Sequence, residues 1–180
     1  MGGCSPAPTL AALTRRILLV GMMGAGKTTV GTALAARLGY LYLDSDEQVE
    51  RHTGRTVPEL FAERGEAAFR AEEKRALAEA MTSAGPVVVS VAGGAVLDPD
   101  NRARLRQGGT VVWLRAPVAT LAQRVGDGHG RPLLGDDPAA ALARLYTVRR
   151  PIYAELADVV VDVEHFTPEE TVEQIMGALA

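Results

Sequence analysis

Short apolar runs alternate with amphipathic segments along most of the 180 residues. Five runs of strand length, rich in Val and Leu, predict β-strands at residues 17–20, 40–43, 86–91, 110–114 and 159–163. Between and after them, apolar positions at helical spacing predict helices at 30–38, 66–81, 99–106, 118–125, 138–153 and 168–179, with shorter helical pieces around 49–52 and 57–61. This alternation predicts an α/β fold, with a parallel sheet covered by helices on both faces.

One domain accounts for this pattern. Residues 15–180 show no repeat, linker or second unit, and residues 1–14 are interpreted as a flexible leader. The rhythm breaks at residues 126–138, where three glycines surround a basic residue. We expect a mobile lid here rather than packed structure, with a plain loop as the alternative. His129 in this segment has no metal or nucleophile pattern around it and is interpreted as an exposed loop residue.

The composition is ordinary for a folded soluble protein, with 47% hydrophobic and 23% charged residues. A formal net charge of -3 gives no general attraction to nucleic acid or to an anionic membrane, so we expect neither as a partner. No apolar run approaches the length of a transmembrane helix. Cys4 is the only cysteine, which excludes an internal disulfide and is consistent with a reducing cytoplasm. We expect a cytoplasmic monomer.

A glycine-rich motif follows the first predicted strand directly. Residues 21–28 read Gly-Met-Met-Gly-Ala-Gly-Lys-Thr and match G-x-x-x-x-G-K-[ST], with a strand before and a helix after. Glycines let backbone N–H groups close around phosphate oxygens, and the helix N-terminus adds its positive dipole end. The lysine can reach the outer phosphates, and the threonine hydroxyl suits Mg²⁺. We therefore predict a nucleoside phosphate site made of Gly24, Ala25, Gly26, Lys27, Thr28 and Thr29.

Other polar residues follow predicted strands at the same edge of the sheet, where ligands of parallel α/β proteins gather. Asp46 comes after the second strand, and Gly93 and Gly94 come after the third. Arg70 and Arg149 suit a carboxylate, because guanidinium donors match it in bidentate fashion. Each residue alone has a structural interpretation, such as a helix cap, a surface arginine or a glycine turn. Together with the phosphate loop they favour a small anionic acceptor.

The combination of segments resembles the shikimate kinases, small P-loop kinases related in fold to the nucleoside monophosphate kinases. The resemblance covers nearly the whole chain from 16 to 179 and is carried by residues 21–29, 43–46, 53–55, 61–70, 90–96, 131–134 and 149–153. It implies a P-loop three-layer α/β/α fold with a five-stranded parallel sheet of order 2-3-1-4-5. The implied reaction moves the γ-phosphoryl group of ATP to the 3-hydroxyl of shikimate, a step in aromatic amino acid biosynthesis.

The resemblance also implies catalytic roles for individual residues. Lys27 would stabilise the charge on the transferring phosphoryl group, and Asp46 would hold the acceptor hydroxyl and take its proton. Arg131 would close from the lid onto the phosphates of ATP, and Arg124 would lie near the nucleotide. These roles agree with what phosphoryl transfer requires, which is positioning and charge stabilisation with little covalent work by the protein.

The same resemblance assigns the metal and the acceptor. Thr28 would ligate Mg²⁺, and Asp44 would lie near the waters of the metal. Arg70 and Arg149 would bind the carboxylate of shikimate, and Gly93 would supply a backbone contact.

Two departures from the family pattern stand out. The family turn carries three glycines, and Ala92 replaces the first, where we expect a negative φ. The basic residue that some members place near adenine has no counterpart, and His165 and Phe166 occupy that neighbourhood.

Two alternatives stay open: a diverged relative that phosphorylates another small hydroxy acid, which Ala92 motivates, and a nucleotide-binding regulator without catalysis. Gluconate kinase is less favoured, because its acceptor-side motifs are not found. The charged residues 72–75 are interpreted as a solvated helix face.

Overall fold

The computed structural model describes residues 16–128 and 131–180, so the predictions for the leader and for His129 lie outside the described residues. Within this part of the chain, five parallel strands form one sheet in the order β2-β3-β1-β4-β5. This order confirms the expected sheet. The strands are β1 (Arg16–Val20), β2 (Leu41–Asp44), β3 (Val87–Ser90), β4 (Thr110–Arg115) and β5 (Val159–Asp162).

The central strands are apolar because helices cover both of their faces. All four residues of β3 are buried, as are the last four of β1. The edge strands β2 and β5 are more open and expose Leu41 and Val160. Ser90 pairs in register with both Leu19 and Asp44, so β1, β2 and β3 end at the same level. The loops that follow these strands therefore meet at one edge of the sheet.

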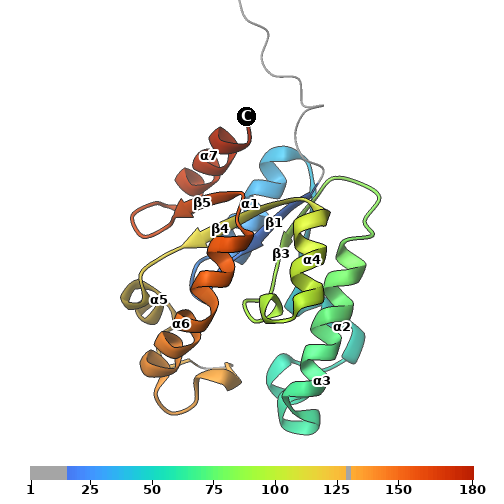
Figure 1. The fold of residues 1–180 in the computed structure, drawn as a ribbon, viewed down its shortest axis with the longest axis vertical. Coiled ribbons are helices and arrows are strands. Elements are labelled where there is room, and N and C mark those ends of the chain that lie inside the picture. Colours follow the sequence, from blue (N-terminus) through green and yellow to red (C-terminus); the bar gives the residue numbers. More distant parts are fainter. Residues whose placement is uncertain (1–15, 129–130) are drawn as a thin grey trace, which may run out of the picture.

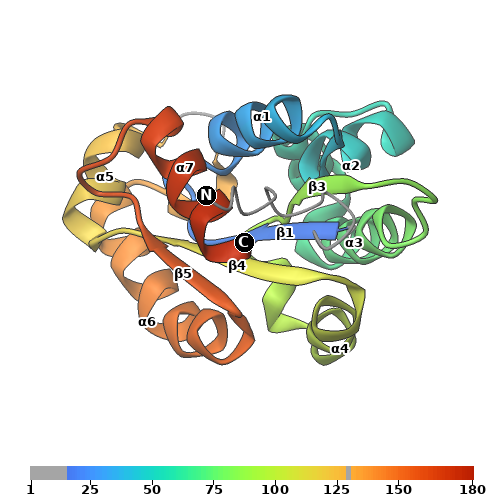
Figure 2. The same ribbon diagram turned by 90° about the horizontal axis from the view of Figure 1, so that it is seen from above.

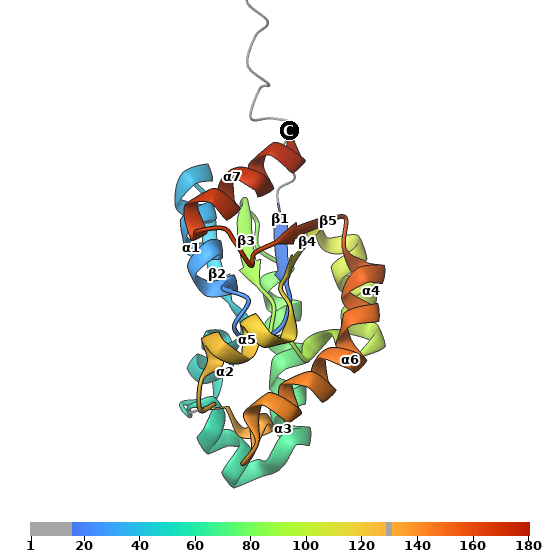
Figure 3. The same ribbon diagram turned by 90° about the vertical axis from the view of Figure 1, so that its left-hand side faces the viewer.

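Two helical layers enclose the sheet. Helices α1 (Lys27–Leu38) and α7 (Pro168–Leu179) cover one face, and α4 (Pro99–Gly108) and α6 (Pro138–Leu156) cover the other (Figures 2 and 3). The predicted last helix starts with a capping box, in which Thr167 and Glu170 each bind the other's backbone N–H. No helix among the described residues is long and apolar enough to cross a membrane.

The remaining helices begin beyond the carboxyl ends of the strands (Figure 1). They are α2 (Ser45–Thr53), α3 (Val57–Ala80) and α5 (Val118–Val125), with short 3₁₀ helices η2 (Ala95–Leu97) and η3 (Pro132–Leu134). Gly65 kinks α3 with a φ of 75°, at the predicted interruption between two helical pieces. Val49, Leu60, Phe69 and Ala76 form a small separate core between α2 and α3. Helix α2 and the first part of α3 therefore project with packing of their own, whereas Leu77 and Ala80 of α3 join the main core.

Two local predictions differ from the structure. The second strand is shifted by one residue, so that Asp44 ends β2 and also caps α2 by accepting a hydrogen bond from the Asp46 amide. The segment predicted as an unpacked lid contains Leu134, which is only 2% exposed. Leu134 lies against Gly128, whose φ of 74° lets the chain turn there. The interpretation of this segment as unpacked is therefore wrong at Leu134.

Candidate active site

A cleft of about 680 Å³ opens at the carboxyl edge of the sheet. It gathers residues from both ends of the chain, and all but one of the predicted site residues line it. Those residues are Gly24, Gly26, Lys27, Thr28, Thr29, Asp44, Asp46, Arg70, Gly93, Gly94, Arg124, Arg131 and Arg149. Ala25 is the exception, because it is 1% exposed and its amide donates to the Met22 carbonyl at 3.2 Å.

The phosphate loop presents backbone donors to this cleft. Gly24 and Gly26 have φ angles of 81° and 87°, in the left-handed region where a residue with a Cβ is strained. The turn at Gly26 leads directly into α1. Within the residues that the structure describes, no side chain caps this helix, and its first turn holds no acidic residue. Its first N–H groups and its positive dipole end are therefore available to an anion.

Lys27 is the first residue of α1, and its ammonium is turned to backbone oxygens of the phosphate loop. Its Nζ donates to the Gly21 carbonyl at 2.9 Å and to the Met22 carbonyl at 3.2 Å. Burial lowers the pKa of Lys27 to about 8, although the Asp46 and Asp44 carboxylates oppose this shift. The side chain is therefore mostly cationic at neutral pH, and a phosphate oxygen can replace the two carbonyls.

Thr28 and Asp44 meet at the edge of the cleft. The Thr28 hydroxyl donates to Asp44 Oδ2 at 3.1 Å, and the Tyr42 hydroxyl lies 3.1 Å from the same oxygen. Tyr42 also lies 2.9 Å from the Ser90 hydroxyl, which donates to the Lys27 carbonyl at 3.1 Å. Burial raises the pKa of Tyr42 to about 12, so it stays protonated. Tyr42 is not among the predicted site residues, because nothing in the local sequence indicates that its hydroxyl joins this network.

The residues at this edge of the cleft offer few ligands for Mg²⁺. Among the described residues, no group of three or more His, Cys, Asp or Glu side chains could hold a metal ion. Thr28 and Asp44 offer two oxygen ligands only. Mg²⁺ usually keeps several waters and takes one or two protein ligands together with substrate phosphates. The donor set therefore suits Mg²⁺ that arrives with a nucleotide, rather than a metal held by the protein alone.

Asp46 lies in the first turn of α2 and is open to the cleft. The protein around the cleft desolvates its carboxyl and raises its pKa, and the nearby Asp44 carboxylate acts in the same direction. Lys27 and Arg131 oppose this effect. A carboxylate with a raised pKa is a better proton acceptor, so Asp46 suits the task of a general base.

Arg149 forms one wall of the cleft from α6. It is only 2% exposed, and its Nε has no hydrogen-bond partner among the described residues. It lies close to the backbone of the glycine turn, since an ideal Cβ on Gly93 would be 3.3 Å from Arg149 Nη1 and 3.3 Å from the Tyr153 hydroxyl. Tyr153 donates to the Gly93 carbonyl at 2.7 Å. A buried cation with an unpaired donor is costly, and an anion in the cleft would relieve that cost.

Arg70 approaches the glycine turn from α3. Its Nη1 donates to both Glu73 carboxylate oxygens, at 2.8 and 3.1 Å, and its Nη2 donates to Glu66 at 3.0 Å. The guanidinium packs on Gly94, where an ideal Cβ would lie 2.8 Å from Arg70 Cζ. Any larger residue at position 94 would displace Arg70.

Glu73 contradicts the prediction of a solvated helix face at residues 72–75. Its side chain is 2% exposed and lines the cleft beside Arg70. Burial raises the pKa of its carboxyl, while Arg70 and more weakly Arg149 oppose that shift. A signal existed in the sequence, because Glu73 is four residues from both Phe69 and Leu77, which are buried. Its polarity outweighed its helical position in the prediction.

The remaining predicted residues are placed as follows. Ala92 has no positive φ, as expected, and its amide donates to the Ser45 hydroxyl at 2.8 Å. Arg124 donates to the Val163 carbonyl at 2.7 Å and to the Gly24 carbonyl at 3.4 Å, so it links the end of β5 to the phosphate loop. Arg131 is exposed at the rim of the cleft.

Known proteins share this arrangement. The family model for shikimate kinase matches residues 23–180. The chain is 49% identical over 162 residues to shikimate kinase from Thermobifida fusca, covering 90% of this chain and 93% of that one. It is 47% identical over 167 residues to shikimate kinase from Paramagnetospirillum magneticum, covering 92% and 84%. Shikimate kinase from Acinetobacter baumannii, solved in complex with shikimate, superposes with a TM-score of 0.86 at 40% identity, covering 89% of this chain and 90% of that one. The chain therefore belongs to the shikimate kinase family.

Proposed function

We propose that this kinase transfers the γ-phosphoryl group of ATP to the 3-hydroxyl of shikimate, giving shikimate 3-phosphate and ADP. The observation that carries the acceptor is the buried Arg149, which lines the same cleft as the phosphate loop and whose Nε has no hydrogen-bond partner among the described residues. Together with Arg70 it forms a cationic wall suited to a carboxylate. The related structure from Acinetobacter baumannii was solved with shikimate, which is a hydroxylated carboxylic acid.

The proposed transfer uses three groups of this chain. The backbone of the phosphate loop holds the phosphates, and Lys27 stabilises the charge on the moving group. Asp46 orients the acceptor hydroxyl and accepts its proton. The hydroxyl oxygen then forms a bond to the γ-phosphorus as the bond from that phosphorus to the bridging oxygen breaks, and ADP leaves. Asp46 later releases the proton to water.

Mg²⁺ and the lid complete the proposal. When bound, Mg²⁺ would neutralise charge on the phosphates. Thr28 would hold it with its hydroxyl oxygen, and Asp44 would hold its waters. Arg131 would move from the rim onto the phosphates, and the closed lid would exclude water that competes with the acceptor. The monomeric state, the cytoplasmic location and the absence of nucleic acid or membrane partners stay predictions.

An ATP-consumption assay across hydroxylated carboxylic acids tests the proposal. Shikimate, quinate and gluconate are compared at equal concentration, with ATP and Mg²⁺ in excess. We expect turnover that depends on shikimate and exceeds that with the other acids. Faster turnover with another acid would identify a diverged relative, and nucleotide binding without turnover on any acid would identify a regulator. Either result would overturn the proposed reaction.

A further inference from the structure

The proposed carboxylate site joins two elements that are distant in the sequence. Arg70 and Glu73 lie on α3, whereas Gly94 lies in the turn that leads through η2 into α4. The Arg70 guanidinium packs directly on Gly94. A small displacement of α3 along this turn would therefore move the guanidinium away from the acceptor.

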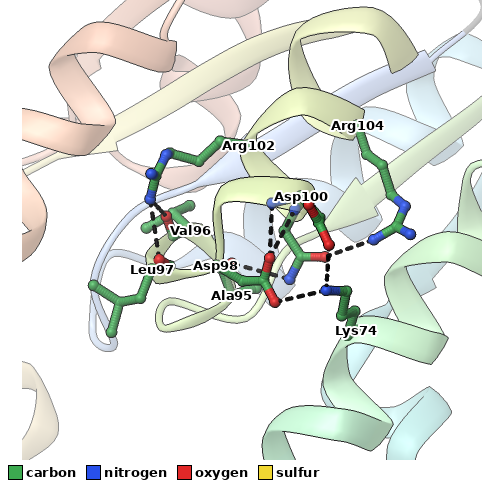
Figure 4. Close-up of polar contacts among 9 residues, drawn as sticks. Lys74, Ala95, Val96, Leu97, Asp98, Asp100, Arg102 and Arg104 are labelled. Atoms are coloured by element: carbon green, nitrogen blue, oxygen red, sulfur yellow. Dashed lines mark hydrogen bonds and ion pairs between the residues drawn. The ribbon is translucent and has the colours of Figure 1, made fainter.

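Lys74 forms a second attachment between the same two elements, as Figure 4 shows. Its ammonium lies 3.0 Å from the Asp98 carboxylate and 2.6 Å from the Asp100 carboxylate. The two attachments are four residues apart in both segments. Arg70 meets Gly94. Four residues further along each segment, Lys74 meets Asp98. Two contacts one helical turn apart fix both the position and the rotation of α3 against the turn.

The far end of this attachment is itself held firmly. Asp98 caps α4, with its Oδ1 accepting from the amides of the residues two and three positions later, at 2.7 and 3.4 Å. Asn101 is 2% exposed, and its Nδ2 donates to the Ala95 carbonyl at 3.0 Å. Arg102 donates to the carbonyls of the two residues before Asp98, both at 3.0 Å (Figure 4). Asp98 is therefore held in a fixed position relative to the glycine turn, so a contact with Asp98 also positions α3 relative to that turn.

We propose that Lys74 is a positioning residue for the acceptor site. By bridging Asp98 and Asp100 it holds α3 against the turn that carries Gly94, and so keeps Arg70 where it receives the carboxylate of the substrate. The inference rests on the proposed role of Arg70 in acceptor binding. Lys74 does not line the cleft, so it acts through Arg70 and not on a reacting group.

The variant Lys74→Met keeps the apolar stem and removes the charge. We expect KM for shikimate to rise about three- to tenfold, while kcat and KM for ATP change less than about twofold. Lys74→Arg keeps a cation and should restore most of the shikimate affinity. The matched control is Arg75→Met, which also removes an ion pair from α3 but pairs with Glu79 on the same helix, at 3.0 Å.

The variant Arg70→Ala distinguishes an error in the positioning role of Lys74 from an error in the proposed acceptor site. If Arg70→Ala raises KM for shikimate and Lys74→Met does not, the positioning role is overturned and the site stands. If neither variant changes KM for shikimate, the proposed role of Arg70 falls as well. An equal rise with Arg75→Met, or no rescue by Lys74→Arg, would indicate general loosening of α3 and would also overturn the positioning role. Thermal unfolding of each variant verifies that it is folded under the assay conditions.

Discussion

Two halves of the same cleft are constructed in different ways. The phosphate half comes from one continuous segment, in which β1, the glycine loop and α1 follow each other directly. Its donors are backbone N–H groups and one lysine. The acceptor half takes Arg70 and Glu73 from α3, Gly93 and Gly94 from the turn after β3, and Arg149 from α6.

The difference lies in what keeps each half in place. Backbone angles and helix geometry preorganise the donors of the phosphate half, and hydrogen bonds from Ser90 and Arg124 to the Lys27 and Gly24 carbonyls support them. The acceptor half places two arginines and a buried carboxylate together. A buried charge is stable only when a group of opposite charge pairs with it. Damage to the phosphate half should therefore impair nucleotide binding and phosphoryl transfer, whereas damage to the proposed acceptor half should impair shikimate binding.

Removal of the lysine should give the largest effect on turnover. Lys27→Ala should lower kcat by roughly 10²–10³-fold, because a preorganised donor to developing charge is lost. The affinity for shikimate, measured by calorimetry, should stay near that of the wild type. Near-normal turnover in a folded Lys27→Ala protein would contradict the assignment of the phosphate loop.

The phosphate half should also carry the pH dependence of nucleotide binding. Burial lowers the pKa of Lys27 to about 8, and bound phosphate should raise it again. The bound state then holds the proton more tightly, so above about pH 8 binding takes up a proton and ATP affinity falls as pH rises, by up to about tenfold per unit. Shikimate affinity should stay flat, since arginine does not titrate there. Calorimetry at several pH values measures both, and an ATP affinity that is constant above about pH 8 would contradict this account.

Tyr42 tests the support behind the phosphate half. Tyr42→Phe removes a hydroxyl that contacts Asp44 and Ser90, and should lower the free energy of unfolding by about 0.5–1.5 kcal/mol. Turnover should fall only a few fold, because Thr28 still donates to Asp44. Tyr40→Phe is the matched control, since no hydrogen bond of the Tyr40 hydroxyl occurs among the described residues. Equal denaturation midpoints for the two variants would argue against the network.

The smallest effect is expected in the acceptor half, at Ala92. Its φ is not positive, so alanine is unstrained there and restricts the unfolded chain. Ala92→Gly should lower stability by about 0.4–1 kcal/mol and leave shikimate turnover within a few fold. Chemical denaturation and steady-state assays measure the two quantities. A large gain in activity with shikimate would show that the alanine methyl obstructs this acceptor.

Local signals predicted most of the fold and the phosphate half. Apolar runs rich in Val and Leu marked the strands, and the glycine spacing before Lys27 marked the phosphate loop. The family resemblance supplied the strand order, which the structure confirms. Asp44 caps α2, since Asx side chains bind nearby backbone N–H groups.

The rest depended on tertiary partners. Glu73 is buried because Arg70 neutralises it, and Tyr42 reaches Ser90 only because β2 and β3 pair in register. Leu134 packs into the main core, where the glycine content predicted an open segment. Ala25 matched the motif but lies in the core. The local sequence gives the type of each residue, whereas tertiary packing decides whether its side chain faces the core, the cleft or the solvent.

The central claim is that Arg149 receives the carboxylate of shikimate. Binding of shikimate and of its methyl ester to the wild type and to Arg149→Met tests it most directly, by calorimetry in the presence of ADP. Loss of one partner of a buried charge pair costs about 2–5 kcal/mol, so the wild type should prefer the acid by tens to thousands of fold. In Arg149→Met this preference should largely disappear, while ADP affinity is kept. An unchanged preference for the acid in the variant would contradict the account.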